Sequence, residues 1–265
     1  MIMKVEDRTY VISGGASGLG RACAENIHGK GGYVAIIDMN ADMAAGILEA
    51  TSDEKIKFFQ IDVTQTESIS VAVSEVRAWV LETGKAIGGI ITAAGVSIPA
   101  KIIDRDMNPF SLEDFNLVMN VNVRGTIDLI RQFLPQILMT EPVGKDGERG
   151  VIIMVSSVAA YDGQPGQVSY SASKGAISSL TLPLARDLSR HGIRVITIAP
   201  GLFNSGMTAM MGVKLRKSIL KAMEFPLRMG EPHEFAQLAS HVIENNMLNG
   251  VVLRLDGGIR LPSKI

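Results

Sequence analysis

Short apolar runs rich in β-branched residues recur along the chain and alternate with longer amphipathic stretches. The runs show little apolar–polar alternation and are bounded by Gly, Asp or Ser, which is typical of parallel strands buried on both faces of a sheet. The predicted strands lie near Thr9–Ser13, Tyr33–Asp38, Lys57–Ile61, Gly89–Ala93, Val151–Ser156, Ile193–Ile198 and Val251–Leu255.

Helices are predicted in the amphipathic stretches between these strands, where apolar residues recur at helical spacing. Thr64 with Glu67, and Ser111 with Asp114, have the spacing of capping boxes at helix starts. The strand–helix alternation predicts a doubly wound α/β sheet with right-handed crossovers, and we expect residues 1–265 to form a single domain. The clearest helical stretches are 66–83, 111–139, 167–190 and 231–244.

Composition and charge narrow the function classes. The 265 residues include 26 Lys and Arg and 27 Asp and Glu, so a net charge of −1 gives no reason to expect nucleic acid or an anionic membrane as a partner. The single cysteine, Cys23, excludes an internal disulfide framework and Cys-rich metal sites. No apolar run is long enough to span a membrane, and the N-terminus resembles neither a signal peptide nor a transit peptide. We expect a soluble intracellular protein without a metal centre.

A glycine-rich turn follows the first predicted strand and precedes a helix, where Ser13 to Gly20 have the sequence SGGASGLG. Its G-x-x-x-G-x-G spacing differs from the G-x-G-x-x-G dinucleotide fingerprint, but glycines serve both in the same way. They let the backbone turn tightly and approach a pyrophosphate, which rests on the helix N-terminus. A glycine turn without a ligand is the alternative, and the strand–helix context disfavours it. The candidate residues are Gly14, Ser17, Gly18, Leu19 and Gly20.

Two acidic residues follow predicted strands. Asp38 ends the second strand, where a carboxylate can accept hydrogen bonds from both adenosine ribose hydroxyls and would repel a 2′-phosphate. The position of Ser17 holds no Arg or Lys that could bind the 2′-phosphate, so NAD is favoured over NADP. The alternative for Asp38 is a solvated side chain at the end of a strand. Asp62 follows the third strand, with Val63 beside it, and could either bond the adenine amino group or cap the next helix.

A candidate catalytic group lies in the second half of the chain. Tyr170 and Lys174 are four residues apart, so they share one helix face, and a nearby ammonium lowers the pKa of a phenol. Such a Tyr can act as a general acid or base. Ser157 lies at the end of a predicted strand, 13 residues before Tyr170, where ligands of open α/β sheets bind. Asn120 and Asn122 are unfavourable within a helix, so one of them is expected to have a specific bonding role.

Together these motifs resemble the short-chain dehydrogenase/reductase family. Further segments resemble its subgroup of type II 3-hydroxyacyl-CoA dehydrogenases, which is also known for hydroxysteroid oxidation; they are 149–153, 157–160, 166–167, 182–188, 198–203, 248–257 and an extended loop near 97–113. The resemblance implies a Rossmann-type parallel sheet of about seven strands in the order 3-2-1-4-5-6-7. It also implies a homotetramer built on the helices 111–139 and 167–190. The matching positions are Ser13 to Gly20, Asn122 with Gly125, Ser157, Tyr170 with Lys174, and Pro200 with Gly201.

The resemblance also implies individual roles. Tyr170 would be the catalytic acid or base, Lys174 would lower its pKa and hold the nicotinamide ribose, and Ser157 would orient the substrate carbonyl. Asn122 would hold a water molecule in a proton relay, and Gln167 would contact substrate. The further cofactor contacts that the resemblance implies are Ser17, Leu19, Asp38, Asp62, Val63, Ala93, Gly95, Pro200, Gly201, Phe203 and Ser205.

The expected function is NAD-dependent interconversion of a secondary alcohol and its ketone, with a 3-hydroxyacyl-CoA or a hydroxysteroid as the small-molecule substrate. A secondary-metabolite intermediate is an alternative substrate, and a non-catalytic binding protein on the same fold is an alternative of another class. One departure from the family is Thr92, which stands where the family has Asn. The C-terminal Ser263-Lys264-Ile265 is one substitution from the peroxisomal Ser-Lys-Leu signal, so a cytoplasmic or peroxisomal location is favoured over a mitochondrial one.

Overall fold

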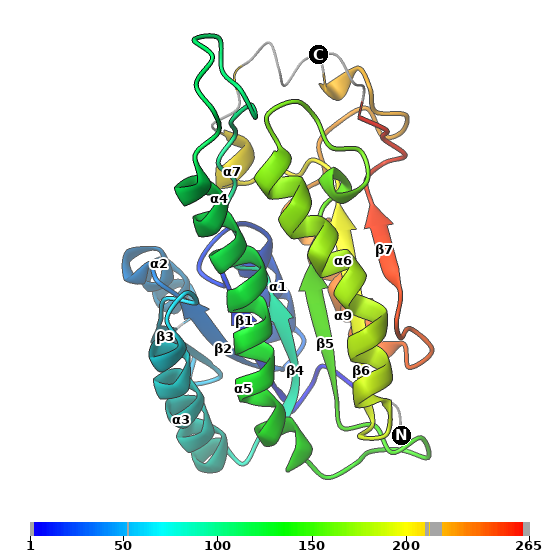
Figure 1. The fold of residues 1–265 in the computed structure, drawn as a ribbon. Coiled ribbons are helices and arrows are strands. Elements are labelled where there is room, and N and C mark those ends of the chain that lie inside the picture. Colours follow the sequence, from blue (N-terminus) through cyan, green and yellow to red (C-terminus); the bar gives the residue numbers. More distant parts are fainter. Residues whose placement is uncertain (1–2, 52, 210–211, 213–218, 262–265) are drawn as a thin grey trace.

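Parallel strands form one sheet that is covered by helices on both faces (Figure 1). The computed structural model describes residues 3–51, 53–209, 212 and 219–261. Within them the seven strands have the order β3-β2-β1-β4-β5-β6-β7, which confirms the predicted fold. The strands are β1 (Thr9–Ser13), β2 (Tyr33–Asp38), β3 (Ile56–Gln60), β4 (Ile87–Thr92), β5 (Gly150–Val155), β6 (Ile193–Pro200) and β7 (Val252–Leu255).

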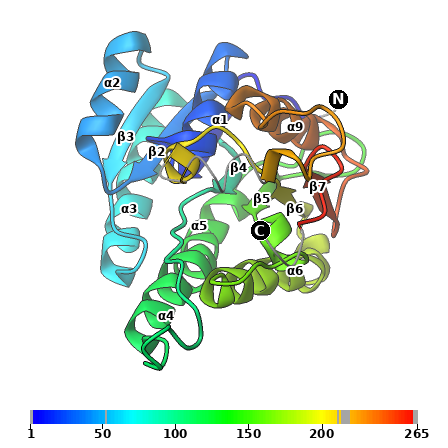
Figure 2. The same cartoon turned by 90° about the horizontal axis from the view of Figure 1, so that it is seen from above.

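The helices lie in two layers. Figure 2 shows α1, α2 and α9 on one side of the sheet and α3, α5 and α6 on the other. The α-helices are α1 (Gly18–Gly29), α2 (Ala41–Thr51), α3 (Thr66–Thr83), α4 (Leu112–Met119), α5 (Thr126–Leu138), α6 (Val168–Ser189), α7 (Gly206–Ala209) and α9 (Pro232–Glu244). A π-helical segment, η1 (Asn120–Gly125), joins α4 to α5, and a short 3-10 helix, η2 (Val158–Ala160), follows β5.

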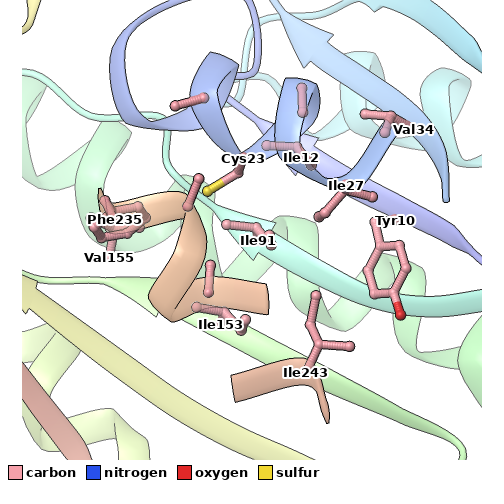
Figure 3. Close-up of a cluster of buried hydrophobic side chains, with 14 of the residues drawn as sticks. Tyr10, Ile12, Cys23, Ile27, Val34, Ile91, Ile153, Val155, Phe235 and Ile243 are labelled. Atoms are coloured by element: carbon pink, nitrogen blue, oxygen red, sulfur yellow. The ribbon is translucent and has the colours of Figure 1, made fainter. Parts of the chain in front are cut away.

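Neighbouring residues of each central strand point into different cores. Ile12 and Ile36 pack with α1, α2 and α9, whereas Val11 and Ile37 pack with α3, α5 and α6. This explains why the strands lack apolar–polar alternation, since both faces of the sheet are dry. Figure 3 shows the first of these clusters, in which Cys23 is 1% exposed. Burial raises the pKa of the Cys23 thiol to about 12.

One of the two predicted capping boxes is present only in part and the other is wrong. Ser111 caps α4, and its hydroxyl accepts a hydrogen bond from the backbone N–H of Asp114 at 3.1 Å. Thr64 does not cap α3, which begins at Thr66. Gln65 occupies the N-cap position, and the Thr64 hydroxyl donates to the carboxylate of Asp62 at 2.8 Å.

A membrane-spanning helix is not found, since no helix in the described parts of the chain is both long and apolar enough. The tripeptide 263–265, on which the peroxisomal expectation depends, lies outside the described residues.

A buried ion pair lies at the amino-terminal end of the sheet, and no sequence motif predicts it. Arg194 of β6 donates from Nε to Glu148 at 2.6 Å, and both side chains are less than a tenth exposed. The two Nη atoms donate to the backbone carbonyl oxygens of Val242 and Ile243 at 2.8 and 2.7 Å. These carbonyl groups lie in the last turn of α9, where a cation is favourable. Arg194 therefore fastens α9 to the sheet.

We expect Arg194→Ala to lower the free energy of unfolding by about 3–5 kcal/mol, because it leaves the buried Glu148 carboxylate without its partner. Urea unfolding measures the change. Arg21→Ala is the matched control, since Arg21 pairs with Glu25 on an exposed surface, where such a pair contributes about 1 kcal/mol or less. Equal effects of the two substitutions would contradict the role of Arg194.

Candidate active site

The predicted site residues gather at the carboxyl ends of the strands. In a parallel sheet these ends meet at one edge, and Figure 2 views the molecule from that edge. The glycine-rich turn follows β1, Asp38 ends β2, Ser157 follows β5, and Pro200 ends β6. Residues far apart in the sequence are therefore brought to a common region.

The glycine-rich turn folds tightly on itself and on the loop after β4. Gly14 has φ +66° and Gly18 has φ +53°, a region that favours glycine. A Cβ atom on Gly20 would lie 2.2 Å from the Gly14 carbonyl oxygen, and one on Gly14 would lie 2.7 Å from the backbone nitrogen of Ala94. Glycine is thus required at both positions for the turn to exist.

The N-terminus of α1 is suited to an anion. Ser17 is its N-cap, the Ser17 side chain makes no capping hydrogen bond, and the first turn contains no acidic residue. The partial positive charge of this helix end faces the turn. Asp38 lies beside it, because one carboxylate oxygen accepts the N–H of Ala16 at 3.1 Å and the other accepts the N–H of Asn40 at 3.0 Å. These residues fit the pyrophosphate and ribose of a dinucleotide.

Ser157, Tyr170 and Lys174 are brought together as the sequence predicts. Ser157 is the N-cap of η2, where its hydroxyl accepts the N–H of Ala159 at 3.1 Å. The Ser157 hydroxyl is close enough to the Tyr170 hydroxyl to lower the pKa of that phenol by hydrogen bonding. The Lys174 ammonium lies 5.7 Å from the centroid of the Tyr170 ring and donates to the backbone oxygen of Val155 at 2.8 Å. β5 and α6 thus present a hydroxyl, a phenol and an amine to one place.

Burial controls the ionisation of this group. Burial raises the pKa of the Tyr170 hydroxyl, and the hydrogen bond from Ser157 opposes that shift. Burial also lowers the pKa of Lys174 to about 8. The direction for Tyr170 is opposite to the expectation from sequence, which considered the neighbouring ammonium but could not include the loss of water around the phenol.

The specific role expected for one of the two mid-helix Asn residues belongs to Asn122. Its side-chain oxygen accepts the N–H of Val96 at 2.8 Å, and its side-chain nitrogen donates to the Val96 carbonyl oxygen at 2.9 Å and to the Ser173 hydroxyl at 2.9 Å. Ser173 in turn donates to the backbone oxygen of Tyr170 at 2.8 Å. Asn122 lies in the π-helical segment η1, and such segments are frequent at functional sites. Asn120, by contrast, is exposed.

Gly95 and Ser205 lie next to the groups already described. A Cβ atom on Gly95 would be 3.2 Å from the side-chain oxygen of Asn122 and 3.4 Å from the Lys174 amine. A Cβ atom on Gly18 would be 3.7 Å from the Cβ of Ser205, so the chain after β6 approaches the glycine-rich turn. Ala93 and Gly201 lie at the same edge of the sheet, directly after β4 and β6.

Three of the predicted contact residues have side chains that already make contacts within the protein. Phe203 is 6% exposed and its ring packs on Phe235, so the ring offers little surface to a cofactor. Gln167 uses its side-chain oxygen to accept the N–H of Gln164 at 2.9 Å. Asp62 does not cap α3, since Gln65 occupies that position.

The remaining observations concern residues that sequence alone could not place. The carbonyl oxygen of Val63 would lie 2.8 Å from a Cβ on Gly125, so Val63 packs on η1. Ser156 donates to the backbone oxygen of Lys174 at 2.7 Å and was missed by the motif. The buried Thr92 hydroxyl has no hydrogen-bond partner among the described residues. Among all the residues that the structure describes, no group of three or more His, Cys, Asp and Glu residues could hold a metal ion.

Comparison with known proteins gives a consistent picture. The family model described as short chain dehydrogenase matches residues 8–215. The 3-hydroxyacyl-CoA dehydrogenase type-2 of Drosophila melanogaster is 41% identical over 262 residues, covering 97% of this chain and 99% of the relative. The ipsdienol dehydrogenase of Ips pini is 31% identical, covering 98% of this chain and 100% of the relative. A crystal structure of 3-hydroxyacyl-CoA dehydrogenase type-2 from Mycobacterium avium has a TM-score of 0.88 at 32% identity, covering 97% of each chain.

We expect Lys174→Met to raise the free energy of unfolding at pH 7 by about 2 kcal/mol. Lowering the pKa of Lys174 from 10.5 to about 8 corresponds to about 3 kcal/mol of disfavoured charge, of which about 1 is offset by the lost hydrogen bond to Val155. The unfolded state binds the extra proton between pH 8 and 10.5, so the stability of the wild type rises with pH across that window.

Urea unfolding at several pH values measures this gap. It should be constant below about pH 8 and should shrink by about 3 kcal/mol as the pH rises through and beyond 10.5, so that the wild type becomes more stable than the variant by about 1 kcal/mol, the worth of the hydrogen bond to Val155. Lys101→Met is the control, since Lys101 is exposed and the same change should have little effect. A gap that is absent at pH 7, or that does not depend on pH, would refute the buried-charge account of Lys174.

Proposed function

The chain belongs to the short-chain dehydrogenase family and acts on CH–OH groups, and from this premise we propose that it interconverts a 3-hydroxyacyl-CoA and its 3-ketone with NAD. The observation that carries the proposal is the convergence of Ser157, Tyr170 and Lys174 beside the glycine-rich turn. A hydroxyl, a phenol and an amine in that arrangement can orient a carbonyl and move a proton to or from its oxygen.

The described residues suit a nicotinamide dinucleotide. The turn from Gly14 to Gly20 and the N-terminus of α1 would hold the pyrophosphate, and Asp38 would hold the adenosine ribose. Lys174 would hold the nicotinamide ribose, and Ser205 the carboxamide. When bound, the nicotinamide ring supplies a hydride acceptor or donor for the carbinol carbon.

The protein's own groups handle the proton. In the oxidation direction, Tyr170 takes the proton of the substrate hydroxyl while Ser157 orients that hydroxyl. Because burial alone raises the pKa of Tyr170, its deprotonation depends on the two groups that favour the phenolate, the Lys174 ammonium and the Ser157 hydrogen bond. Asn122, held by Val96 and Ser173, would position a water molecule that links Lys174 to solvent.

The substrate class rests on the relatives. The relative of greatest identity described above is a 3-hydroxyacyl-CoA dehydrogenase type-2, which favours the acyl thioester over a hydroxysteroid. The similarity to an ipsdienol dehydrogenase supports the second candidate, a small secondary-metabolite alcohol. A non-catalytic protein on the same fold is disfavoured, since the three groups above retain hydrogen-bonded or close positions that binding alone does not need.

A homotetramer is part of the proposal. Large apolar side chains are exposed along the outer faces of α4, α5 and α6, where the family resemblance places subunit contacts. A pocket of about 440 Å³ opens on the same face, between η1 and α5. Its lining is mixed and consists of Met119, Asn120, Val123, Arg124, Ile127, Asp128 and Arg131. Exposed apolar surface of this kind is typical of protein interfaces. The exposed residues are Leu117, Ile127, Leu138, Val168 and Leu182.

The proposal is tested by following NADH absorbance at 340 nm with acetoacetyl-CoA, a longer 3-ketoacyl-CoA, hydroxysteroids and ipsdienone. We expect turnover of the CoA esters, and we expect Tyr170→Phe to lower kcat by about 10²- to 10⁴-fold because the proton donor is lost. Tyr33→Phe is the control, since Tyr33 begins β2 at the opposite end of the sheet.

Two results would count against the proposal. Turnover of ipsdienone alone would favour the secondary-metabolite candidate. Unchanged behaviour of Tyr170→Phe in every assay would favour the non-catalytic alternative.

We expect Asp38→Ala to lower the ratio of kcat/KM for NAD to that for NADP at least about tenfold, because it removes both the ribose acceptor and the repulsion of a 2′-phosphate. Asp42→Ala is the matched control, since Asp42 is an exposed acid in the first turn of the neighbouring α2. If the ratio changes equally in both variants, the effect comes from the net negative charge of this region. If the ratio changes in neither variant, Asp38 does not determine the choice between NAD and NADP.

A further inference from the structure

Arg254 of β7 forms a cluster at the carboxyl edge of the sheet, outside the groups described so far. One of its Nη atoms donates to the Asp162 carboxylate at 2.6 Å, and its Nε donates to the Asp256 carboxylate at 2.7 Å. The guanidinium carbon lies 5.4 Å from the centroid of the Tyr161 ring. All three charged side chains are less than a quarter exposed. Arg254 thus joins the loop after η2 to the turn after β7.

Asp162 belongs to the structure that presents Ser157. The backbone N–H groups of Tyr161 and Asp162 both donate to the Val158 carbonyl oxygen at 2.9 Å, which closes the turn that Ser157 caps. The next residue, Gly163, packs so closely on α6 that a Cβ atom would lie 2.7 Å from the Ser171 hydroxyl oxygen. The turn is therefore held between the first turn of α6 and the Arg254 guanidinium.

Asp256 holds the other side of the site. A Cβ atom on Gly201 would lie 2.9 Å from Asp256, so the chain after β6 rests on this turn. The N–H of Phe225 donates to the Gly257 carbonyl oxygen at 3.2 Å. Asp256 also accepts the N–H of Gly258 at 3.0 Å.

The two carboxylates differ in what they would keep without Arg254. Asp256 would keep the N–H of Gly258 and a longer contact of 3.4 Å from Arg260. The Asp162 carboxylate accepts no second hydrogen bond from the described residues. Loss of Arg254 would therefore leave a partly buried carboxylate unpaired on the turn that carries Ser157, while the turn after β7 would keep its shape.

We propose that Arg254 is a positioning residue for the reaction: through Asp162 it holds the turn from Ser157 to Ala160 so that the Ser157 hydroxyl meets Tyr170. The inference rests on the proposed function, since it assigns Ser157 to the substrate carbonyl. It adds a residue that lies on β7 and need not touch substrate or cofactor. The ion pair keeps the Ser157 hydroxyl aligned with Tyr170, and small displacements of reacting groups slow a reaction strongly.

The test compares Arg254→Ala, Asp162→Ala and the double variant with Arg260→Ala as the matched control. Arg260 approaches the same Asp256 but is exposed and does not reach Asp162. We expect Arg254→Ala and Asp162→Ala each to lower kcat/KM for the ketone about tenfold or more, with no further loss in the double variant. NADH affinity, measured by fluorescence, should stay within about twofold, because Asp38 and the glycine-rich turn do not contact Arg254. Arg254→Lys should recover part of the activity.

Hydrogen-exchange mass spectrometry of the free protein gives a second readout that needs no substrate. Peptides covering 157–163 should exchange faster in Arg254→Ala and Asp162→Ala than in Arg260→Ala. If Arg254→Ala has the kcat, KM and exchange of Arg260→Ala at a temperature where both are folded, the proposal is wrong. If the wild type converts none of the ketones, the proposed substrate fails, and the exchange comparison still decides whether Arg254 holds the turn.

Discussion

All strands of the sheet run in the same direction, and the rest of the structure follows from that constraint. A chain that leaves every strand at one edge must cross back over the sheet, so both faces become covered and the strands become apolar throughout. The same constraint collects the loops after β1, β2, β4, β5 and β6 at one edge. There the chain can place a glycine turn, a carboxylate and a Ser–Tyr–Lys group together without any two of them being close in sequence.

This arrangement has an energetic cost at the reactive groups. Lys174 is buried and Tyr170 is partly buried, so burial lowers the pKa of Lys174 and raises the pKa of Tyr170, and both shifts favour neutral forms. The surrounding polar contacts hold these groups in place despite that cost. Val155 and Ser156 of the β5 end bond to Lys174, and Ser173 links α6 to Asn122. Reactive side chains in such a site are aligned by neighbours that do not react.

Much of this was predictable from sequence, because local patterns carry it. The strand runs, the cap at Ser111 and the spacing of Tyr170 and Lys174 each depend on residues within a few positions. The expectation for Thr64 was wrong because α3 begins at Thr66, so Thr64 lies one residue before the N-cap position, and its hydroxyl donates to Asp62. Arg194 and Arg254 were not foreseen, since their partners Glu148 and Asp162 are distant in sequence and long flexible side chains leave no periodic signal. The π-helical geometry around Asn122 also depends on contacts made after folding.

The burial of Cys23 has a practical consequence. The chain holds one thiol, it is 1% exposed, and burial raises its pKa to about 12, so almost no thiolate is present near neutral pH. Alkylating reagents and mild oxidants act on thiolates, so Cys23 should not react with them in the folded protein. A cysteine introduced at an exposed position such as Met107 could therefore carry a spin label or fluorophore alone, without first replacing Cys23 and disturbing the core around α1.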